Sequence, residues 1–184
     1  MSDFGKLLGP MARRIGNLLA RGSVAAVNGT GKMRTLQLRM LAGEVKDNVE
    51  HFEPYGFTSE VLPGAEHITA FFDGDRSHGV VLVAADRRYR LQLQSGEVAI
   101  FTNHGDKVVI HADGTIEVVA STKVQISSPL VNMSGSLTVQ GNIVAQGDIS
   151  DHGNKAMAGM RGTYNGHTHT DPQGGTVPAP NQAM

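Results

Sequence analysis

The sequence predicts a mainly β protein that begins with a helix, continues as a small antiparallel barrel and ends in a needle of short strands shared among chains. Three observations support this prediction. The N-terminal residues repeat apolar side chains at helical spacing, and the following segment alternates as short strands do. The second half is rich in Gly, Val and Ile, and the chain is only 5% aromatic, which does not fill a wide core.

Composition narrows the classes of function. The formal net charge is -1 and charged residues make up 18%, so no basic excess indicates a nucleic-acid partner. The absence of cysteine rules out disulfides, thiolate metal sites and a cysteine nucleophile, and it fits a protein made in a reducing cytoplasm. No apolar run approaches the roughly 20 residues of a membrane-spanning helix, and we expect no signal peptide.

Residues 1–22 are predicted to form an amphipathic helix that ends at Gly22. Pro10 does not fit an uninterrupted helix interior, so a break is expected there. The apolar face either packs on the chain's own domain or docks on a partner protein. It is formed by Phe4, Leu7, Leu8, Met11, Ile15, Leu18 and Leu19.

Residues 23–90 are predicted to form a small barrel of four or five strands. Two strands, 23–27 and 34–41, flank the turn sequence Asn28-Gly29-Thr30-Gly31. Two more, 68–72 and 79–84, flank Asp73-Gly74-Asp75. Between these two pairs lies a looser stretch that contains prolines. This pattern favours an OB-fold-like domain.

An OB-fold raises the alternative of a nucleic-acid-binding module with an oligomerising tail. Such binding requires aromatic side chains on a basic face. Here the Lys and Arg residues are spread out rather than interleaved with the aromatic residues, and we predict no nucleic-acid partner. The one dense basic cluster, Arg87, Arg88 and Arg90, is expected to be a solvated linker between domains.

Residues 91–160 are predicted to form a repeat of strands that are too short to be stable alone. Apolar residues occur as i, i+2 pairs such as Val98 with Ile100, and groups rich in Gly, Ser, Asn and Asp separate the pairs. Further along, the spacing tightens to about six to eight residues. The apolar residues of this tighter stretch are Val124, Ile126, Val131, Met133, Leu137, Val139, Ile143 and Ile149.

Two architectures bury such a repeat. A single-chain β-helix needs about 18 residues per coil, and only the last residues of the repeat match the required period of about six. In an intertwined trimeric β-prism, three chains each supply one short strand per layer, so irregular spacing is tolerated and the sheet edges are closed. The spacing therefore favours a trimeric β-helix or β-prism needle.

Residues 161–184 are predicted to form a metal-bound tip. Within Gly166-His167-Thr168-His169-Thr170, the two histidines are spaced i, i+2, so on an extended chain their imidazoles point to the same side. The segment from Thr176 to Pro180 is expected to be a short extended stretch that folds back or trails. Two nitrogen ligands are too few for a closed metal site.

Threefold symmetry would supply the missing ligands. If three chains direct His167 and His169 at a common axis, six imidazole nitrogens form an octahedral site. Such ligands suit iron, nickel, cobalt or zinc better than calcium or magnesium, and because structural zinc usually takes four ligands, six nitrogens favour iron. A metal without an open position, about one per trimer, would be structural and would hold three chain ends together.

Over essentially its whole length, the chain resembles the central spike proteins of contractile-tailed phages. The resemblance lies in the order of helix, OB-like strands and β-repeat, and above all in the terminal GHTHT followed by DPQGG and a Thr/Pro-rich end. It implies a homotrimer with an OB-fold collar that joins the tail hub and baseplate proteins, and a tapering needle whose apex binds iron through His167 and His169. The implied location is the baseplate tip of the virion tail, after assembly in the host cytoplasm.

The function that this resemblance implies is mechanical. When the tail sheath contracts, such a spike pierces the bacterial outer membrane without hydrolytic chemistry, so no catalytic residue and no enzyme activity are expected. Calcium and chloride ions also occur along the needles of similar proteins. This would make Asp148 and Asp151 calcium ligands, although no spacing in the sequence identifies them as such.

Two enzyme interpretations stand beside the spike. A metal-dependent hydrolase would add His152 or Asp171 to the paired histidines and keep a position open for water, but no HExxH motif is present. A hexapeptide-type acyltransferase would use His104 or His111 as a general base, but its repeat should persist over several coils. The remaining histidines are expected on the surface or in loops, namely His51, His67, His78, His104 and His111.

Overall fold

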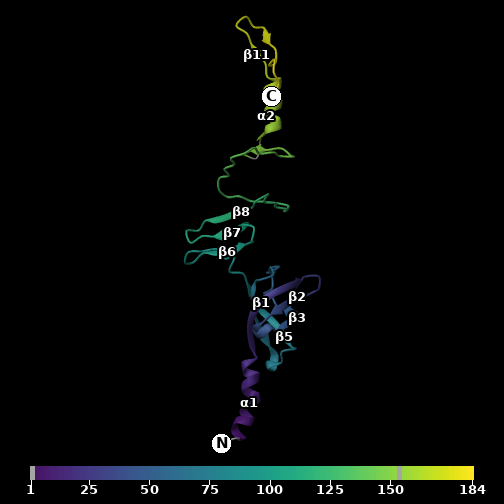
Figure 1. Cartoon of the computed structure of the whole chain (residues 1–184). Helices are drawn as coiled ribbons and strands as arrows, with labels where there is room; N and C mark the ends of the chain where they lie inside the picture. Colours follow the sequence, from purple (N-terminus) through teal and green to yellow (C-terminus); the bar gives the residue numbers. More distant parts are fainter. Residues whose placement is uncertain (1–2, 153–154) are drawn as a thin grey trace. The chain divides into compact units, whose positions relative to one another are not determined.

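The protein is mainly β with a short N-terminal helix, as predicted (Figure 1). In this computed structural model, residues 3–152 and 155–184 are described. The chain forms two compact units, the first ending at Gln125 and the second beginning at Ile126. The first unit contains the helix, a closed barrel and a three-stranded sheet, and the second contains the paired histidines.

The N-terminal helix α1 spans Asp3–Gly16 and continues through Pro10, so the expected break at Pro10 was wrong. The expected end at Gly22 was also wrong, because Gly22 lies in strand β1 (Leu19–Asn28). A Cβ at Gly22 would stand 2.0 Å from the carbonyl oxygen of Arg39 and 2.7 Å from Nε2 of His67. Gly22 therefore permits close contact between barrel strands and does not cap the helix.

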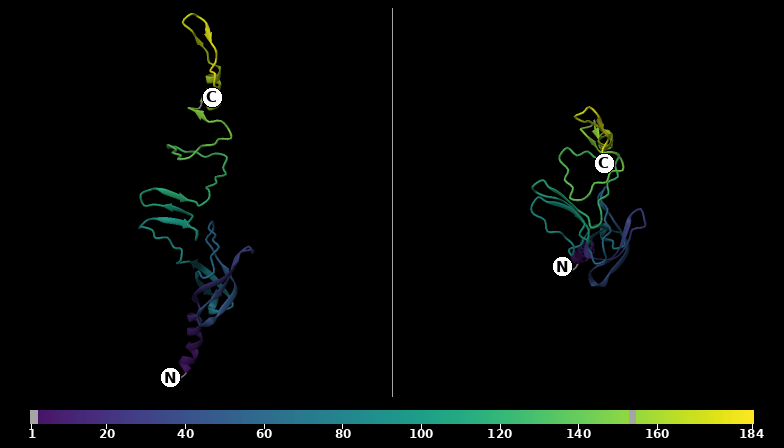
Figure 2. Two further views of the ribbon diagram at one scale, coloured as in Figure 1. Left: turned by 45° about the horizontal axis from the view of Figure 1, so that its top comes forward. Right: turned by 90° about the horizontal axis from the view of Figure 1, so that it is seen from above.

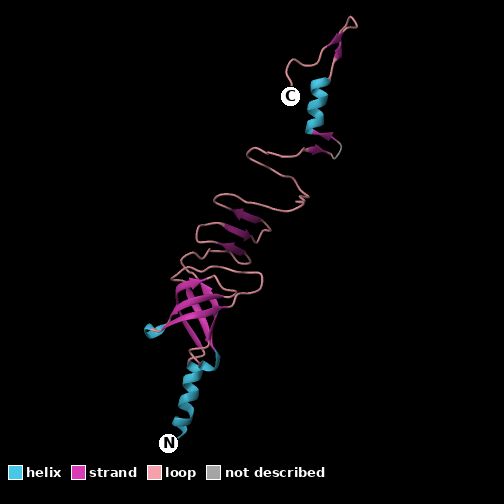
Figure 3. Ribbon diagram, turned by 90° about the vertical axis from the view of Figure 1, so that its right-hand side faces the viewer, coloured by secondary structure: helices cyan, strands magenta, loops and turns pink. Residues whose placement is uncertain are grey.

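A closed five-stranded barrel follows, which confirms the predicted OB-fold-like domain (Figure 3). Strand β1 is followed by β2 (Arg34–Arg39), β3 (Val45–His51), β4 (Glu66–Phe71) and β5 (Gly79–Ala85). Their spatial order is β1-β2-β3-β5-β4, closed by pairing of β4 with β1. All neighbours are antiparallel except β3 and β5, which run parallel. Two short 3-10 helices, η1 (Leu41–Gly43) and η2 (Phe72–Gly74), follow β2 and β4.

Both predicted hairpins of the barrel are confirmed, whereas β3 was missed. Its pairing with β2 shifts between Leu36 and Leu38, and Asn48 has a φ of 55°. This bulge interrupts the period-two alternation on which strand prediction depends. The apolar core that the strands enclose consists of Val24, Leu36, Leu38, Val49, Ala65 and Val81.

The three strands after the barrel form an antiparallel sheet. They are β6 (Val98–Phe101), β7 (Lys107–Ile110) and β8 (Ile116–Val119), in the order β6-β7-β8, and they confirm three of the predicted apolar pairs. Residues 120–149, all of them described, contain no strand. The winding course of residues 126–149, within the second unit, can be followed in green in Figure 2. The apolar residues of this stretch are exposed, including Ile126, Leu137 and Ile143.

The second unit ends in two small hairpins and a helix. Strands β9 (Ser150–Asp151) and β10 (Lys155–Ala156) form the first hairpin, and β11 (His169–Thr170) and β12 (Thr176–Val177) form the second. Helix α2 (Met157–Gly166) lies between them in the chain, and the sequence analysis did not predict it. Among the described residues, neither helix is both long and apolar enough to cross a membrane.

Candidate metal centre

His167 lies directly after helix α2, and the helix end fixes its imidazole. Nδ1 of His167 is 2.5 Å from the carbonyl oxygen of Tyr164, one turn earlier in the chain, and the two aromatic rings stand 5.5 Å apart. A carbonyl oxygen only accepts hydrogen bonds, so Nδ1 must carry the proton. The lone pair of the neutral imidazole is therefore on Nε2, which is the nitrogen free to bind a metal.

His169 begins strand β11 and lies beside His167. The centroids of the two imidazole rings are 4.9 Å apart, and the ring planes are nearly perpendicular at 86°. Pairing of β11 with β12 holds His169 opposite Val177. In the turn between these strands, the Asp171 carboxylate accepts hydrogen bonds from the backbone N–H groups of Gln173 and Gly175, at 2.9 and 2.7 Å. The structure thus brings the two predicted ligands together.

The two aspartates assigned to calcium have other partners. Asp148 Oδ1 accepts hydrogen bonds from the backbone N–H of Ile149 at 2.9 Å and of Ala158 at 3.2 Å, so it caps the first turn of α2. Asp151 pairs with the neighbouring His152.

The described residues of one chain do not assemble a complete metal site. Across residues 3–152 and 155–184, no group of three or more His, Asp or Glu side chains is placed to hold a metal ion. The two proposed extra ligands of a hydrolase are engaged elsewhere, His152 with Asp151 and Asp171 in its turn. The donor set does fit a transition metal, because imidazole nitrogens suit iron, nickel, copper and zinc, and Nε2 of His167 is free to bind.

The sheet β6–β8 has one entirely apolar side. The registers place Val98 opposite Ile110 and Ile110 opposite Ile116, so these side chains point to the same side of the sheet. We call this side the apolar face; its side chains remain between 38% and 65% exposed. Its members are Val98, Ile100, Val108, Ile110, Ile116 and Val118.

The opposite side of the same sheet carries a polar network. His111 Nδ1 lies 2.8 Å from Glu97, and its Nε2 lies 3.4 Å from Glu117, which also pairs with Lys107 at 3.0 Å. The hydrogen bond to Glu97, together with Glu117, raises the pKa of His111 above its usual value near 6.5. This side also carries apolar residues, but Val109 among them is only 2% exposed. The apolar face, in contrast, has no such cover in the single chain.

The expectation that the remaining histidines lie on the surface or in loops was wrong for two of them, which lie in barrel strands. His51 and His67 are only 6% and 1% exposed. Nδ1 of His67 is 2.9 Å from the hydroxyl of Thr69. Burial lowers the pKa of both imidazoles from the usual value near 6.5, because desolvation disfavours the charged form.

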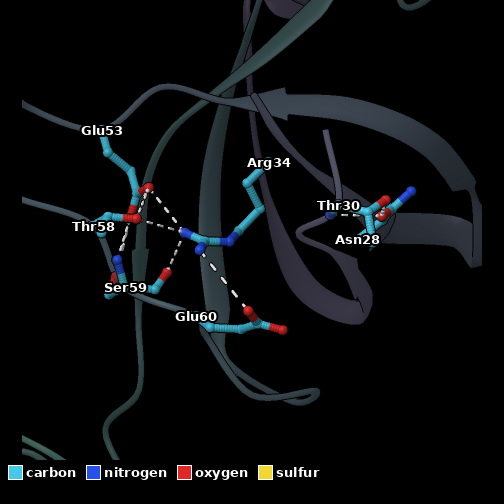
Figure 4. A network of polar contacts seen from close by, with 7 residues as sticks. All are labelled: Asn28, Thr30, Arg34, Glu53, Thr58, Ser59 and Glu60. Atoms are coloured by element: carbon cyan, nitrogen blue, oxygen red, sulfur yellow. Dashed lines mark hydrogen bonds and ion pairs between the residues drawn. The ribbon is translucent and has the colours of Figure 1, made fainter. Parts of the chain in front are cut away.

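A polar network also fixes the loop after β3 (Figure 4). Arg34 binds Glu53 at 2.9 Å and the carbonyl oxygen of Ser59 at 2.6 Å. Burial raises the pKa of the Glu53 carboxyl, but hydrogen bonds from Ser59 and Thr58 and the charge of Arg34 outweigh burial and lower it. The fully exposed Tyr55 is carried by this loop.

The predicted basic linker also contains ion pairs. Arg87 donates to Glu66 at 2.9 Å, and Arg88 lies 2.5 Å from a carboxylate oxygen of Asp86. In the described barrel, these two basic side chains are therefore paired with acidic ones and do not form an unbroken positive surface for phosphates.

The fold and site define a mainly β protein in which a closed barrel is followed by short strands with an uncovered apolar face and by a pair of histidines. A family model described as bacteriophage Mu Gp45, N-terminal, matches residues 21–88, which contain the barrel except for the first two residues of β1. The baseplate puncturing device gp45 of Escherichia phage Mu is 31% identical over 188 residues, which is 96% of this chain and 95% of that protein. The Mu-like prophage FluMu protein gp45 of Haemophilus influenzae is 27% identical over 97% of this chain and all of its own length. The chain belongs to the phage Mu gp45 family.

Proposed function

We propose that this protein is a non-enzymatic, homotrimeric spike of a phage tail baseplate, which pierces the bacterial outer membrane when the tail sheath contracts. Membership of the gp45 family supports this, because the phage Mu relative is named as a baseplate puncturing device. In this proposal the barrel is the collar that attaches to hub proteins, and residues 91–160 form the needle. The spike is assembled in the host cytoplasm and becomes part of the virion at the tail tip.

The observation that carries the proposal is the apolar face of β6–β8. Six apolar side chains on one side of a sheet, each at least one third exposed, are unfavourable in water unless another surface covers them. The apolar residues of 120–149 are exposed to water in the same unfavourable way, and this stretch has no strand pairing of its own. Two further copies of the chain would cover these residues and could pair with the stretch that has no strand of its own.

The paired histidines support a shared structural metal, which we propose to be iron. His167 and His169 of three chains would supply six nitrogens, and the Tyr164 carbonyl keeps Nε2 of His167 free to bind. The ion would act as a cross-link between three chain ends, in a protein that has no cysteine for a disulfide. The end of α2 holds His167 in place, and the pairing of β11 with β12 holds His169 in place.

One experiment tests trimer and metal together. Analytical ultracentrifugation of the full chain should give three times the monomer mass of 19.5 kDa. Elemental analysis of the same sample should give one metal ion per three chains, with iron as the expected element. A monomer would refute the spike, and one metal per chain would refute the shared site. The double variant His167→Ala, His169→Ala should lose the metal, while His104→Ala, in an exposed turn, should retain it.

A further inference from the structure

Helix α1 exposes a stripe of apolar side chains. Leu8, Met11 and Ile15 are 46%, 59% and 61% exposed, and they lie at spacings of three and four residues. The helix meets the barrel at η2, where a Cβ on Gly74 would stand 2.3 Å from the carbonyl oxygen of Arg14. At 100° per residue, Arg14 lies about a quarter turn away from the middle of the stripe. Contact with the barrel therefore leaves the stripe open.

The helix also needs stabilisation that its own sequence does not supply. Its 14 residues are near the lower limit for a helix in water, and Pro10 inside it costs roughly 3 kcal/mol relative to alanine. Most helical stability in proteins comes from packing of an apolar face. Because the stripe of α1 is exposed in the single chain, the stabilising surface has to come from another molecule.

The spacing indicates what kind of molecule this is. Leu8, Met11 and Ile15 follow the alternating three- and four-residue steps of a coiled-coil seam, and the sequence continues these steps back to Phe4. Such a seam is complementary to copies of itself in parallel. Pro10 and Arg13 lie on the far side of the helix from the seam, so neither a ring nor a charge would enter a helix bundle.

We infer that the α1 helices of three copies pack around a common axis as a short parallel three-helix bundle, with Leu8, Met11 and Ile15 as its core. This inference rests on the proposed trimer, because threefold symmetry gives three copies of each segment the same polarity along the axis. Three layers are too few to hold chains together alone. Chains already joined elsewhere have a high effective concentration, so the bundle forms within the trimer.

The test uses the absence of cysteine from the natural chain. Met11→Cys introduces one thiol in the proposed bundle core, and the control Arg13→Cys introduces one about 200° round the same helix. Both full-length variants are oxidised under mild conditions and resolved on denaturing gels. Position 11 should cross-link at least about tenfold faster than position 13, because three thiols at one axis have a high effective concentration.

Symmetry makes the product specific. A disulfide joins two thiols, so a trimer yields one covalent dimer and one free chain, and the dimer should level off at two thirds of the protein. If ultracentrifugation shows a trimer but positions 11 and 13 cross-link at equal rates, the bundle is wrong and the spike proposal stands. If the variants and the natural chain are all monomeric, the spike proposal fails and the bundle fails with it.

Discussion

Replacing Ile116 by aspartate distinguishes a trimer-covered face from an ordinary solvent-exposed one. Ile116 and Val119 lie on the same strand β8 but on opposite sides of the sheet. In the single chain Ile116 is 65% exposed and Val119 is 39% exposed. From single-chain burial, Val119→Asp should be the more harmful change. If three chains cover the apolar face, the order reverses and Ile116→Asp is the more harmful.

The size of the effect follows from the exposed surface of Ile116. Full burial of an isoleucine side chain contributes about 1.5–3 kcal/mol. Because 65% of Ile116 is still exposed, covering it adds about 1–2 kcal/mol per chain. Three chains lose about 3–6 kcal/mol per trimer, which is roughly a 10²- to 10⁴-fold weaker association constant at 1.4 kcal/mol per tenfold. Bringing three carboxylates together adds to this loss.

Sedimentation equilibrium of both variants over a range of concentrations measures the effect. Ile116→Asp should dissociate at concentrations where the natural chain and Val119→Asp remain trimeric. Circular dichroism controls for folding, because the barrel lies outside the substituted sheet and should retain its signal. Equal association constants for the two variants would refute the assignment of the apolar face to the trimer interface.

Three further predictions address the barrel, the histidines and the tip. Gly22→Ala should lower the free energy of unfolding by at least about 1–3 kcal/mol, because the added methyl group strains the contact between strands. The control Gly16→Ala should be nearly neutral, because Gly16 has open space around it. Urea denaturation measures the free energy of unfolding of both variants. NMR titration should show that His67 gains its proton below pH 6.5 and His111 above pH 6.5. The neutral, buried His67 therefore favours the folded state above pH 6.5, and this contribution is lost as the pH falls through its folded pKa. The protonated His111 favours the folded state below pH 6.5, and that contribution is lost as the pH rises through its folded pKa. Identical titration midpoints would contradict both environments. If the proposed metal is bound, a chelator should lower the melting temperature of the natural chain but not of His167→Ala, which differential scanning calorimetry would measure.

Much of the barrel could be predicted because its hairpins have clear signals. Strands β1 and β2 alternate around Asn28-Gly29, and β4 and β5 are apolar around a turn. Strand β3 was not predicted because the bulge at Asn48 breaks its alternation of apolar and polar residues. The burial of His67 was not predicted for another reason. The side chains of β4 that point into the barrel are His67, Thr69 and Phe71. Because His67 and Thr69 are polar, the alternation pattern assigns them to the solvent-facing side of the strand.

The candidate site was predictable only in part. The i, i+2 spacing identified His167 and His169, which the structure brings to 4.9 Å between ring centroids. Helix α2 was not predictable from propensity, because Gly159 and Gly162 are poor helix formers. Its first turn depends on Asp148, ten positions before Ala158, and no local pattern reveals that contact. The role of the Tyr164 carbonyl follows from the end of that helix and was equally hidden.

The two halves of the chain bury their apolar residues in different ways. The barrel encloses Leu36, Leu38 and Val81 within a single chain, so its stability is a property of that chain. The segment from Val98 to Ile149 leaves most of its apolar residues exposed in one chain, so in the proposed trimer its stability would depend on assembly. Dilution should therefore loosen the needle before the barrel unfolds. In the proposed spike, a barrel that stays folded while the rest of the chain assembles could bind hub proteins at every stage of assembly.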